Sequence, residues 1–286
     1  MRTLQEMTLQ EKLGQRLAAG FQGLEPPEEF LRLIKEYKVG NIILFRRNIQ
    51  DGPQLKKLCA TLRKVVEEET GVTPFITIDQ EGGVVTRLPE SEVNIPGAMA
   101  VAATGNPRNA YDMGLLTAQE LRSCGVDFNL APVMDINCNP DNPVIGVRSY
   151  GDTPERVAEY GSQMVRGLLD GGVYCSLKHF PGHGDTAVDS HLGLPCIDRS
   201  FDELMQRELK PFIAGIEAGA PAVMTTHILF PQIEPEHIPA TMSRRIMTGL
   251  LREKLGFGGI IISDCMEMDA IKKFYGTVNG VLAAMK

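Results

Sequence analysis

The chain has 286 residues, of which 43% are hydrophobic and 23% charged, and its formal net charge is −7 at pH 7. That length can bury one large core, and the acidic balance leaves no basic footprint for nucleic acid or an anionic membrane surface. The N-terminus lacks the apolar core of a secretion signal, and no apolar run approaches a membrane span. We therefore expect a cytoplasmic protein that acts on a small substrate.

Apolar, β-branched runs that end in polar or small residues recur along the chain, and each predicts a buried strand. They cover residues 15–21, 41–45, 75–79, 127–136, 175–180, 222–227 and 259–264. Amphipathic segments lie between these runs and predict helices with explicit end signals. The expected caps are Asn106 and Thr153, each followed by proline, the Ser200 and Glu203 capping box, and C-terminal glycines at 40, 125, 171 and 256.

This alternation predicts parallel strands joined by helical crossovers, in either a doubly wound open sheet or a TIM-type (β/α)₈ barrel. Chemically loaded residues follow at least five of the strands, which favours the barrel because its mouth gathers all strand ends. We expect one catalytic domain over residues 1–286. No GxGxxG or GxxxxGK[ST] motif follows a strand, so no nucleotide cofactor is expected.

The six cysteines are scattered without a CxxC pair, at positions 59, 124, 138, 175, 196 and 265. Zinc knuckles and thiol redox motifs need paired spacing. We expect six free thiols.

The densest polar segment is KHFPGHGDTAVDSHL, residues 178–192, with three histidines and two aspartates. It could be a solvated loop with capping side chains. It could also be a metal site built from its histidines and aspartates, although a Pro-Gly pair separates His179 from His183 and breaks helical ligand spacing. A third interpretation is a proton-transfer dyad, in which Asp189 orients His191.

At these motifs the chain resembles NagZ-type β-N-acetylhexosaminidases of glycoside hydrolase family 3. KHFPGHGDT followed by DSH is similar to the signature loop of that branch, and it separates the branch from β-glucosidases of the same family. Further similar motifs follow in the family order over nearly the whole chain. They are DQEGG at 79–83, APVMDI and VIGVRS within 131–149, THI at 226–228 and ISDCMEMDAI at 262–271.

The resemblance implies a retaining hydrolase that releases terminal β-linked N-acetylglucosamine from cell-wall-derived or chitin-like fragments. It implies a covalent glycosyl-enzyme intermediate on Asp264, with His191 as acid/base and Asp189 as its partner. A histidine acid/base departs from the usual pair of carboxylates. The structural alternative for Asp264 is a helix N-cap.

The same resemblance implies sugar contacts by Asp79, Arg87, Arg148, Lys178 and His179, without metal or cofactor. The alternatives are a turn or cap role for Asp79 and rim ion pairs for the two arginines. His227 ends a strand and stays outside the predicted set, because a structural histidine explains it equally well.

Three other functions remain open at this level. The same site could transfer the sugar to phosphate, because a neutral histidine repels an incoming anion less than a carboxylate does. The chain could also be an inactive sugar-binding barrel or a metal-dependent hydrolase. The residues do not specify an oligomeric state.

The end of the chain departs from the family pattern. After the run at 259–264 the sequence continues through 265–275 into an apolar helical stretch at 278–286, and no eighth strand follows. Seven strands at barrel tilt leave the first and last incompletely paired. We expect at most seven strands and a chain truncated from a longer enzyme.

Overall fold

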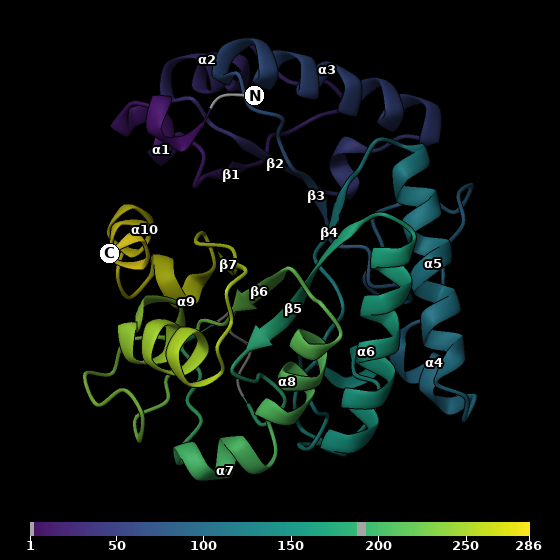
Figure 1. Cartoon of the computed structure of the whole chain (residues 1–286), viewed down its shortest axis with the longest axis vertical. Coiled ribbons are helices and arrows are strands. Elements are labelled where there is room, and N and C mark those ends of the chain that lie inside the picture. The colour runs from purple at the N-terminus through teal and green to yellow at the C-terminus, as the bar shows by residue number, and fades with distance from the viewer. Residues whose placement is uncertain (1–2, 188–192) are drawn as a thin grey trace.

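In the computed structural model, which describes residues 3–187 and 193–286, seven parallel strands form one sheet (Figure 1). The strands are β1 (Ala18–Ala19), β2 (Asn41–Leu44), β3 (Ile76–Ile78), β4 (Phe128–Asn129), β5 (Tyr174–Phe180), β6 (Ala222–Thr225) and β7 (Ile260–Ser263). They lie in chain order, which excludes a doubly wound sheet because that fold reverses its strand order at a switch point. The chain forms a TIM-like α/β fold, and among the described residues β1 pairs only with β2 and β7 only with β6.

Helices cross between successive strands and cover the outside of the sheet (Figure 1). They are α1 (Leu9–Gly14), α2 (Glu28–Tyr37), α3 (Gly52–Thr70), α4 (Ala98–Ala103), α5 (Arg108–Ser123), α6 (Pro154–Asp170), α7 (Phe201–Gln206), α8 (Leu209–Glu217), α9 (Asp269–Lys272) and α10 (Thr277–Met285), with a π-helical segment at Arg245–Lys254. Each predicted strand run overlaps one observed strand, and only β5 extends beyond its run, by one residue at Tyr174. Strand positions were therefore predictable from the sequence.

The predicted N-terminal caps are largely confirmed. Ser200 and Glu203 form the reciprocal capping box of α7. The Asn106 side chain accepts a hydrogen bond from the Arg108 amide at 3.1 Å. Thr153 occupies the N-cap position of α6, but its side chain makes no capping bond there.

Two of the four predicted C-terminal glycines were assigned wrongly. Gly125 and Gly256 adopt left-handed conformations, with φ of 84° and 66°, but the left-handed residues at the other two ends are Lys38 and Gly172. Gly40 instead packs against the end of the Gln15 side chain, whose Oε1 would lie 2.4 Å from an added Cβ. Gly171 likewise packs on α5, where a Cβ would lie 2.3 Å from Ala118 Cβ.

The prediction of one long strand over 127–136 was also wrong. Only Phe128–Asn129 joins the sheet, and Val133 makes a separate bridge to Lys178. Pro132 has no amide hydrogen to donate, so the ladder is interrupted there. The interruption directs the chain after β4 across the carboxyl end of β5.

Burial is greatest in the middle of the sheet. All residues of β3, β4 and β6 are buried, whereas β1 and β7 are partly exposed.

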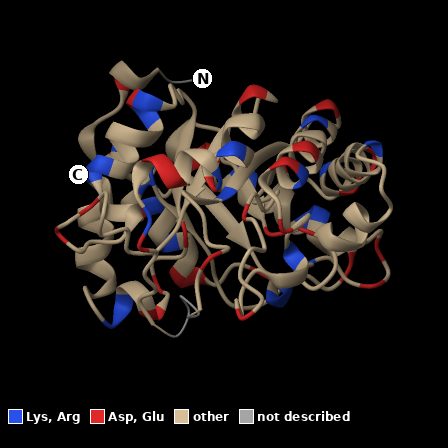
Figure 2. Cartoon of the chain, turned by 90° about the horizontal axis from the view of Figure 1, so that it is seen from below, with Lys and Arg blue, Asp and Glu red and all other residues tan. Residues whose placement is uncertain are grey.

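All six cysteines are free, as predicted. Within the described ranges, no helix has both the length and the apolarity needed to cross a membrane. Basic and acidic residues are interspersed in the view of Figure 2.

Helices α5 and α6 pack so closely that glycine is needed between them. A Cβ on Gly167 would lie 2.1 Å from the carbonyl oxygen of Tyr111. We predict that Gly167→Ala lowers the free energy of unfolding by about 1–3 kcal/mol, because the helices must move apart. Denaturant unfolding measures the change.

Gly249→Ala is the matched control, because a Cβ at Gly249 would meet nothing within 4 Å. In a helical segment this substitution should be neutral or stabilising by up to about 1 kcal/mol. Equal destabilisation by both substitutions would contradict the packing argument.

Candidate active site

A buried ammonium group lies at the carboxyl ends of β3 and β5. Lys178, on β5, is 2% exposed, and its Nζ lies 2.8 Å from Asp79 Oδ1 and 2.6 Å from Glu81 Oε1. Burial opposes its charge, but the two carboxylates outweigh burial and raise the pKa of Lys178. The predicted site residues Asp79 and Lys178 are thus brought together, and Lys178 remains charged.

Arg148 approaches the same group from the turn after residue 145. Its Nε and Nη2 donate to the two carboxylate oxygens of Glu81 at 2.9 and 2.8 Å. Burial works to raise the pKa of Glu81, but Lys178 and Arg148 lower it to about 2. Arg148 therefore forms an ion pair, which was the alternative to sugar binding given for it. The pair is not at the surface, because Glu81 is buried, and it is bidentate.

Arg87 lies on the other side of Asp79. Its Nη2 is 3.5 Å from Asp79 Oδ2, and its backbone amide donates to Gln80 Oε1 at 2.8 Å. Arg87 Nε is buried and has no hydrogen-bond partner in residues 3–187 and 193–286. A buried donor without an acceptor costs free energy of folding unless a ligand or a water molecule accepts its hydrogen bond.

Two histidines of the 178–192 segment converge on Asp135. Its carboxylate lies 2.7 Å from His179 Nδ1 and accepts the His183 amide at 2.7 Å. Burial works to raise the pKa of Asp135, but His179 lowers it below its usual value. Burial and the neighbouring His179 lower the pKa of His183 to about 4, so His183 is neutral near pH 7.

Asp264 follows β7 directly, at the edge of the sheet where the parallel strands end. Its amide donates to the Thr225 carbonyl at 3.2 Å, and its Oδ1 accepts the Cys265 amide at 2.7 Å. Burial works to raise the pKa of Asp264, but the neighbouring imidazoles of His179 and His227 hold it below its usual value. Asp264 is therefore an ionised carboxylate at neutral pH.

His227 positions the backbone next to Asp264. Its Nε2 donates to the Cys265 carbonyl at 3.0 Å, and its Nδ1 lies 2.9 Å from Thr241 Oγ1. These contacts link β6 to the turn that follows β7.

The predicted dyad of Asp189 and His191 lies outside the described residues. Two further residues of the site were missed by sequence reasoning, Glu81 and Asp135. Both stand in motifs already recognised, DQEGG and APVMDI; Glu81 comes shortly after the run at 75–79, whereas Asp135 lies near the end of the run predicted at 127–136. These positions were the available signal.

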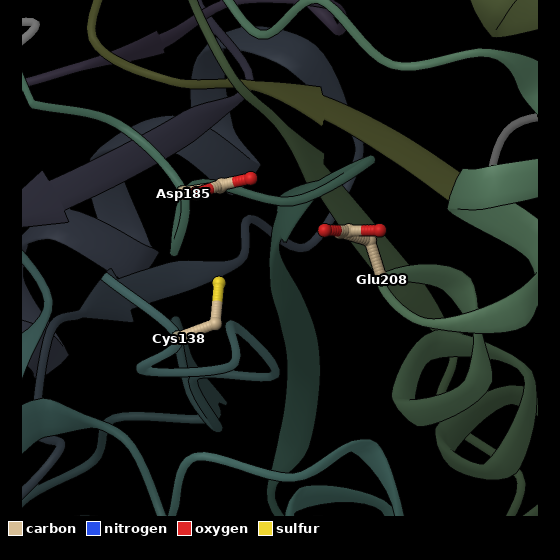
Figure 3. Close-up of side chains that lie close together, drawn as sticks. All are labelled: Cys138, Asp185 and Glu208. Atoms are coloured by element: carbon tan, nitrogen blue, oxygen red, sulfur yellow. The ribbon is translucent and has the colours of Figure 1, made fainter.

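One group among the described residues combines side chains that can ligate a metal, namely Cys138, Asp185 and Glu208 (Figure 3). Their functional groups turn toward a common space. However, Arg207 donates to Glu208 Oε1 at 2.6 Å and to Asp185 Oδ2 at 2.7 Å. The Arg207 guanidinium thus already pairs with the carboxylates of Asp185 and Glu208. We therefore interpret the three side chains as part of an ion-pair network and not as a metal site.

The fold and this geometry define a TIM-like α/β protein with a polar site where the strands end. The chain belongs to glycosyl hydrolase family 3, since the "Glycosyl hydrolase family 3 N terminal domain" matches residues 8–286. The family resemblance inferred from the motifs is confirmed.

Several relatives extend this finding. The chain is 39% identical over 272 residues to "Beta-hexosaminidase A" of Pseudoalteromonas piscicida, covering 90% of this chain and 46% of that protein. A solved family 3 β-N-acetylglucosaminidase from Paenibacillus sp. str. FPU-7 is similar with a TM-score of 0.95 and 49% identity, over 97% of this chain and 53% of that one. NagZ from Neisseria gonorrhoeae, in complex with N-trifluoroacetyl-D-glucosamine, has a TM-score of 0.82 and 34% identity, over 94% and 78% of the two chains. The chain thus spans about half the length of the first two proteins.

The Glu81 ion pairs generate a prediction with a defined pH dependence. The carboxyl pKa falls from 4.5 to about 2 on folding, so its stabilisation is complete above 4.5 and is lost as the pH falls toward about 2. We predict that Glu81→Gln lowers stability by about 3 kcal/mol at neutral pH, because Lys178 loses a buried partner.

Urea unfolding across this pH interval checks the prediction. The difference between Glu81→Gln and the unchanged chain should shrink as the pH falls below 4.5. Glu155→Gln is the control, because Glu155 forms an exposed pair with Lys210 that contributes little. A pH-independent difference for Glu81→Gln would show that shape and not charge causes the loss.

Proposed function

We propose that this chain carries the catalytic site of a retaining glycoside hydrolase that releases terminal β-linked N-acetylglucosamine from cell-wall-derived or chitin-like fragments. The observation that carries the proposal is the placement of the Asp264 carboxylate directly after β7, at the same edge of the parallel sheet as the ion pairs of Lys178 with Asp79 and Glu81 at the ends of β3 and β5. The names of the relatives, a beta-hexosaminidase and a β-N-acetylglucosaminidase, support the sugar.

Asp264 is the nucleophile in this proposal. Its lowered pKa keeps the carboxylate ionised, as attack on an anomeric carbon requires. The attack forms a glycosyl-enzyme ester while the leaving oxygen takes a proton from His191, and Asp189 orients that histidine. Water then hydrolyses the ester with His191 as base, so the product retains its configuration.

Asp79, Arg87, Arg148, Lys178 and His179 hold the sugar in this proposal. A pyranose offers hydroxyls that both donate and accept, which a carboxylate flanked by cations can match. The unmatched Nε of Arg87 supports this, because a sugar oxygen would complete it. Asp135 does not need to touch the sugar, since its contacts already fix the ring of His179.

A paired-substrate assay tests the proposed function. We predict turnover of a chromogenic N-acetyl-β-glucosaminide and much slower turnover of the matching β-glucoside. Asp264→Ala should abolish turnover of both while the fold survives, because a part-exposed residue at a strand end is not a core group. Equal rates on both substrates would contradict the sugar assignment, and residual activity with inverted configuration would make Asp264 a base instead.

Replacing the proton donor should affect substrates unequally. We predict that His191→Ala slows aryl glycosides with poor leaving groups by about 10²–10⁴-fold and activated ones far less, because only the former need full protonation. Asp189→Asn should act in the same direction but more weakly. Steady-state kinetics over a leaving-group series measures this, and an equal loss across the series would indicate a binding or structural role.

A further inference from the structure

A buried carboxylate contacts the ring of His179, one of the residues assigned to the sugar. Asp135 is 1% exposed and lies on the segment that crosses the end of β5 after β4. Its Oδ2 lies 2.7 Å from His179 Nδ1 and accepts the His179 backbone amide at 3.1 Å. Its Oδ1 accepts the His183 amide at 2.7 Å. Asp135 therefore contacts the ring of one histidine and the backbone of the other.

The contact between Asp135 and the His179 ring has a definite direction. An ionised carboxylate can only accept hydrogen bonds, so a ring nitrogen that contacts it must carry the proton. Burial works to raise the pKa of Asp135, but the contacts with His179 and His183 lower it below its usual value. Two backbone amides that donate to the carboxylate also favour its ionised form. The proton in this contact therefore belongs to His179 Nδ1.

Both partners are held in place by further contacts. Ser149 Oγ donates to the Asp135 carbonyl at 2.7 Å, and the Met134 amide donates to the Lys178 carbonyl at 2.7 Å. The second bond ties the segment before Asp135 to the strand that carries His179. The His179 side chain is only 7% exposed. The carboxylate and the ring therefore meet in one defined geometry.

The Nδ1 contact leaves the other ring nitrogen of His179 for the site. Within the part of the chain that the structure describes, the ring makes one hydrogen bond, from Nδ1. We propose that Asp135 is a positioning residue, which keeps a proton on His179 Nδ1 and so presents Nε2 to the sugar. The contact with the sugar rests on the proposed function, whereas the place of the proton does not.

Replacing Asp135 with asparagine should move the proton of the ring. An amide NH₂ in the place of Oδ1 would face the His183 amide, and a backbone N–H cannot accept a hydrogen bond. The NH₂ group should therefore take the place of Oδ2, where it faces His179 Nδ1 and needs an acceptor. The ring supplies that acceptor by carrying its proton on Nε2 instead. The His179 amide can still bond the remaining oxygen, because it lies 3.3 Å from Oδ1.

Long-range proton–nitrogen NMR spectra of the imidazole rings test the proposal, because they report which ring nitrogen carries a proton. The chain has five histidines, and His179→Gln identifies the signals of His179 by their loss. We expect a protonated Nδ1 in the unchanged chain and a proton only on Nε2 in Asp135→Asn. A proton on Nε2 alone in the unchanged chain would overturn the proposal, and so would an Nδ1 proton that persists in Asp135→Asn.

Kinetics with an N-acetyl-β-glucosaminide tests the consequence for the sugar. We expect Asp135→Asn to lower kcat/KM about tenfold, the effect of one hydrogen bond. The double variant with His179→Gln should lose no more than His179→Gln alone, because Asp135 acts through that ring. Asp170→Asn is the matched control and should leave kcat/KM unchanged. It makes the same exchange at an exposed residue at the end of α6, where Asp170 accepts from Tyr111.

Independent losses that add in the double variant would overturn the positioning role, since Asp135 would then act without His179. Thermal melting followed by circular dichroism verifies that each variant is folded. If Asp135→Asn does not fold, the spectrum of the unchanged chain still decides where the proton lies. If the unchanged chain does not hydrolyse the glycoside, the proposed function fails, and the same spectrum still decides the role of Asp135 toward the ring.

Discussion

The buried ammonium of Lys178 is the constraint on which the site depends. A charge removed from water must be paired, and Asp79 and Glu81 supply the pairing from the end of β3. Glu81 in turn binds Arg148 through both oxygens, which draws the turn at 146–148 over the same strand ends. A single lysine on β5 therefore fixes three segments that are distant in sequence.

The carboxylates of the site differ in role because their surroundings differ. Glu81 and Asp135 are surrounded by hydrogen-bond donors of the protein itself. Glu81 pairs with Arg148 and Lys178, and Asp135 accepts hydrogen bonds from His179 and His183. Asp264 has one oxygen bonded by the next amide. Among residues 3–187 and 193–286 its carboxylate forms no ion pair at salt-bridge distance, and its pKa lies below the usual value, which agrees with the role of nucleophile proposed for it.

The sequence predicted the positions of secondary-structure elements better than the side-chain pairings between them. Strand positions followed from apolar runs, because a parallel sheet buried on both faces requires them. The polar residues after β3, β5 and β7 were expected at one edge, and they lie there. Pairings such as Arg148 with Glu81 join residues 67 positions apart, and no local pattern specifies them.

The left-handed conformation was predicted wrongly at two of the four helix-end glycines for a related reason. Gly40 and Gly171 were predicted as left-handed helix ends from local spacing. Gly171 does end α6, but the left-handed residues are Lys38 and Gly172, and a Cβ at Gly171 would meet Ala118 of α5, which only the tertiary fold brings close. Likewise, the apolar run at 127–136 hid Asp135, because a strand prediction gave no reason for a carboxylate there to be buried. Long-range contacts decide these positions, and one sequence does not contain them explicitly.

The position of β7 has a consequence for the local stability of the site. Among the described residues β7 is held by the ladder to β6 alone, and Ile260 at its start is 42% exposed. Segments with a single ladder and open flanks open locally more easily than the buried centre of a sheet. Amide exchange should therefore be faster along β7 than along β3 or β6. Mild heating would therefore first loosen the strand that directly precedes Asp264, before the helices unfold.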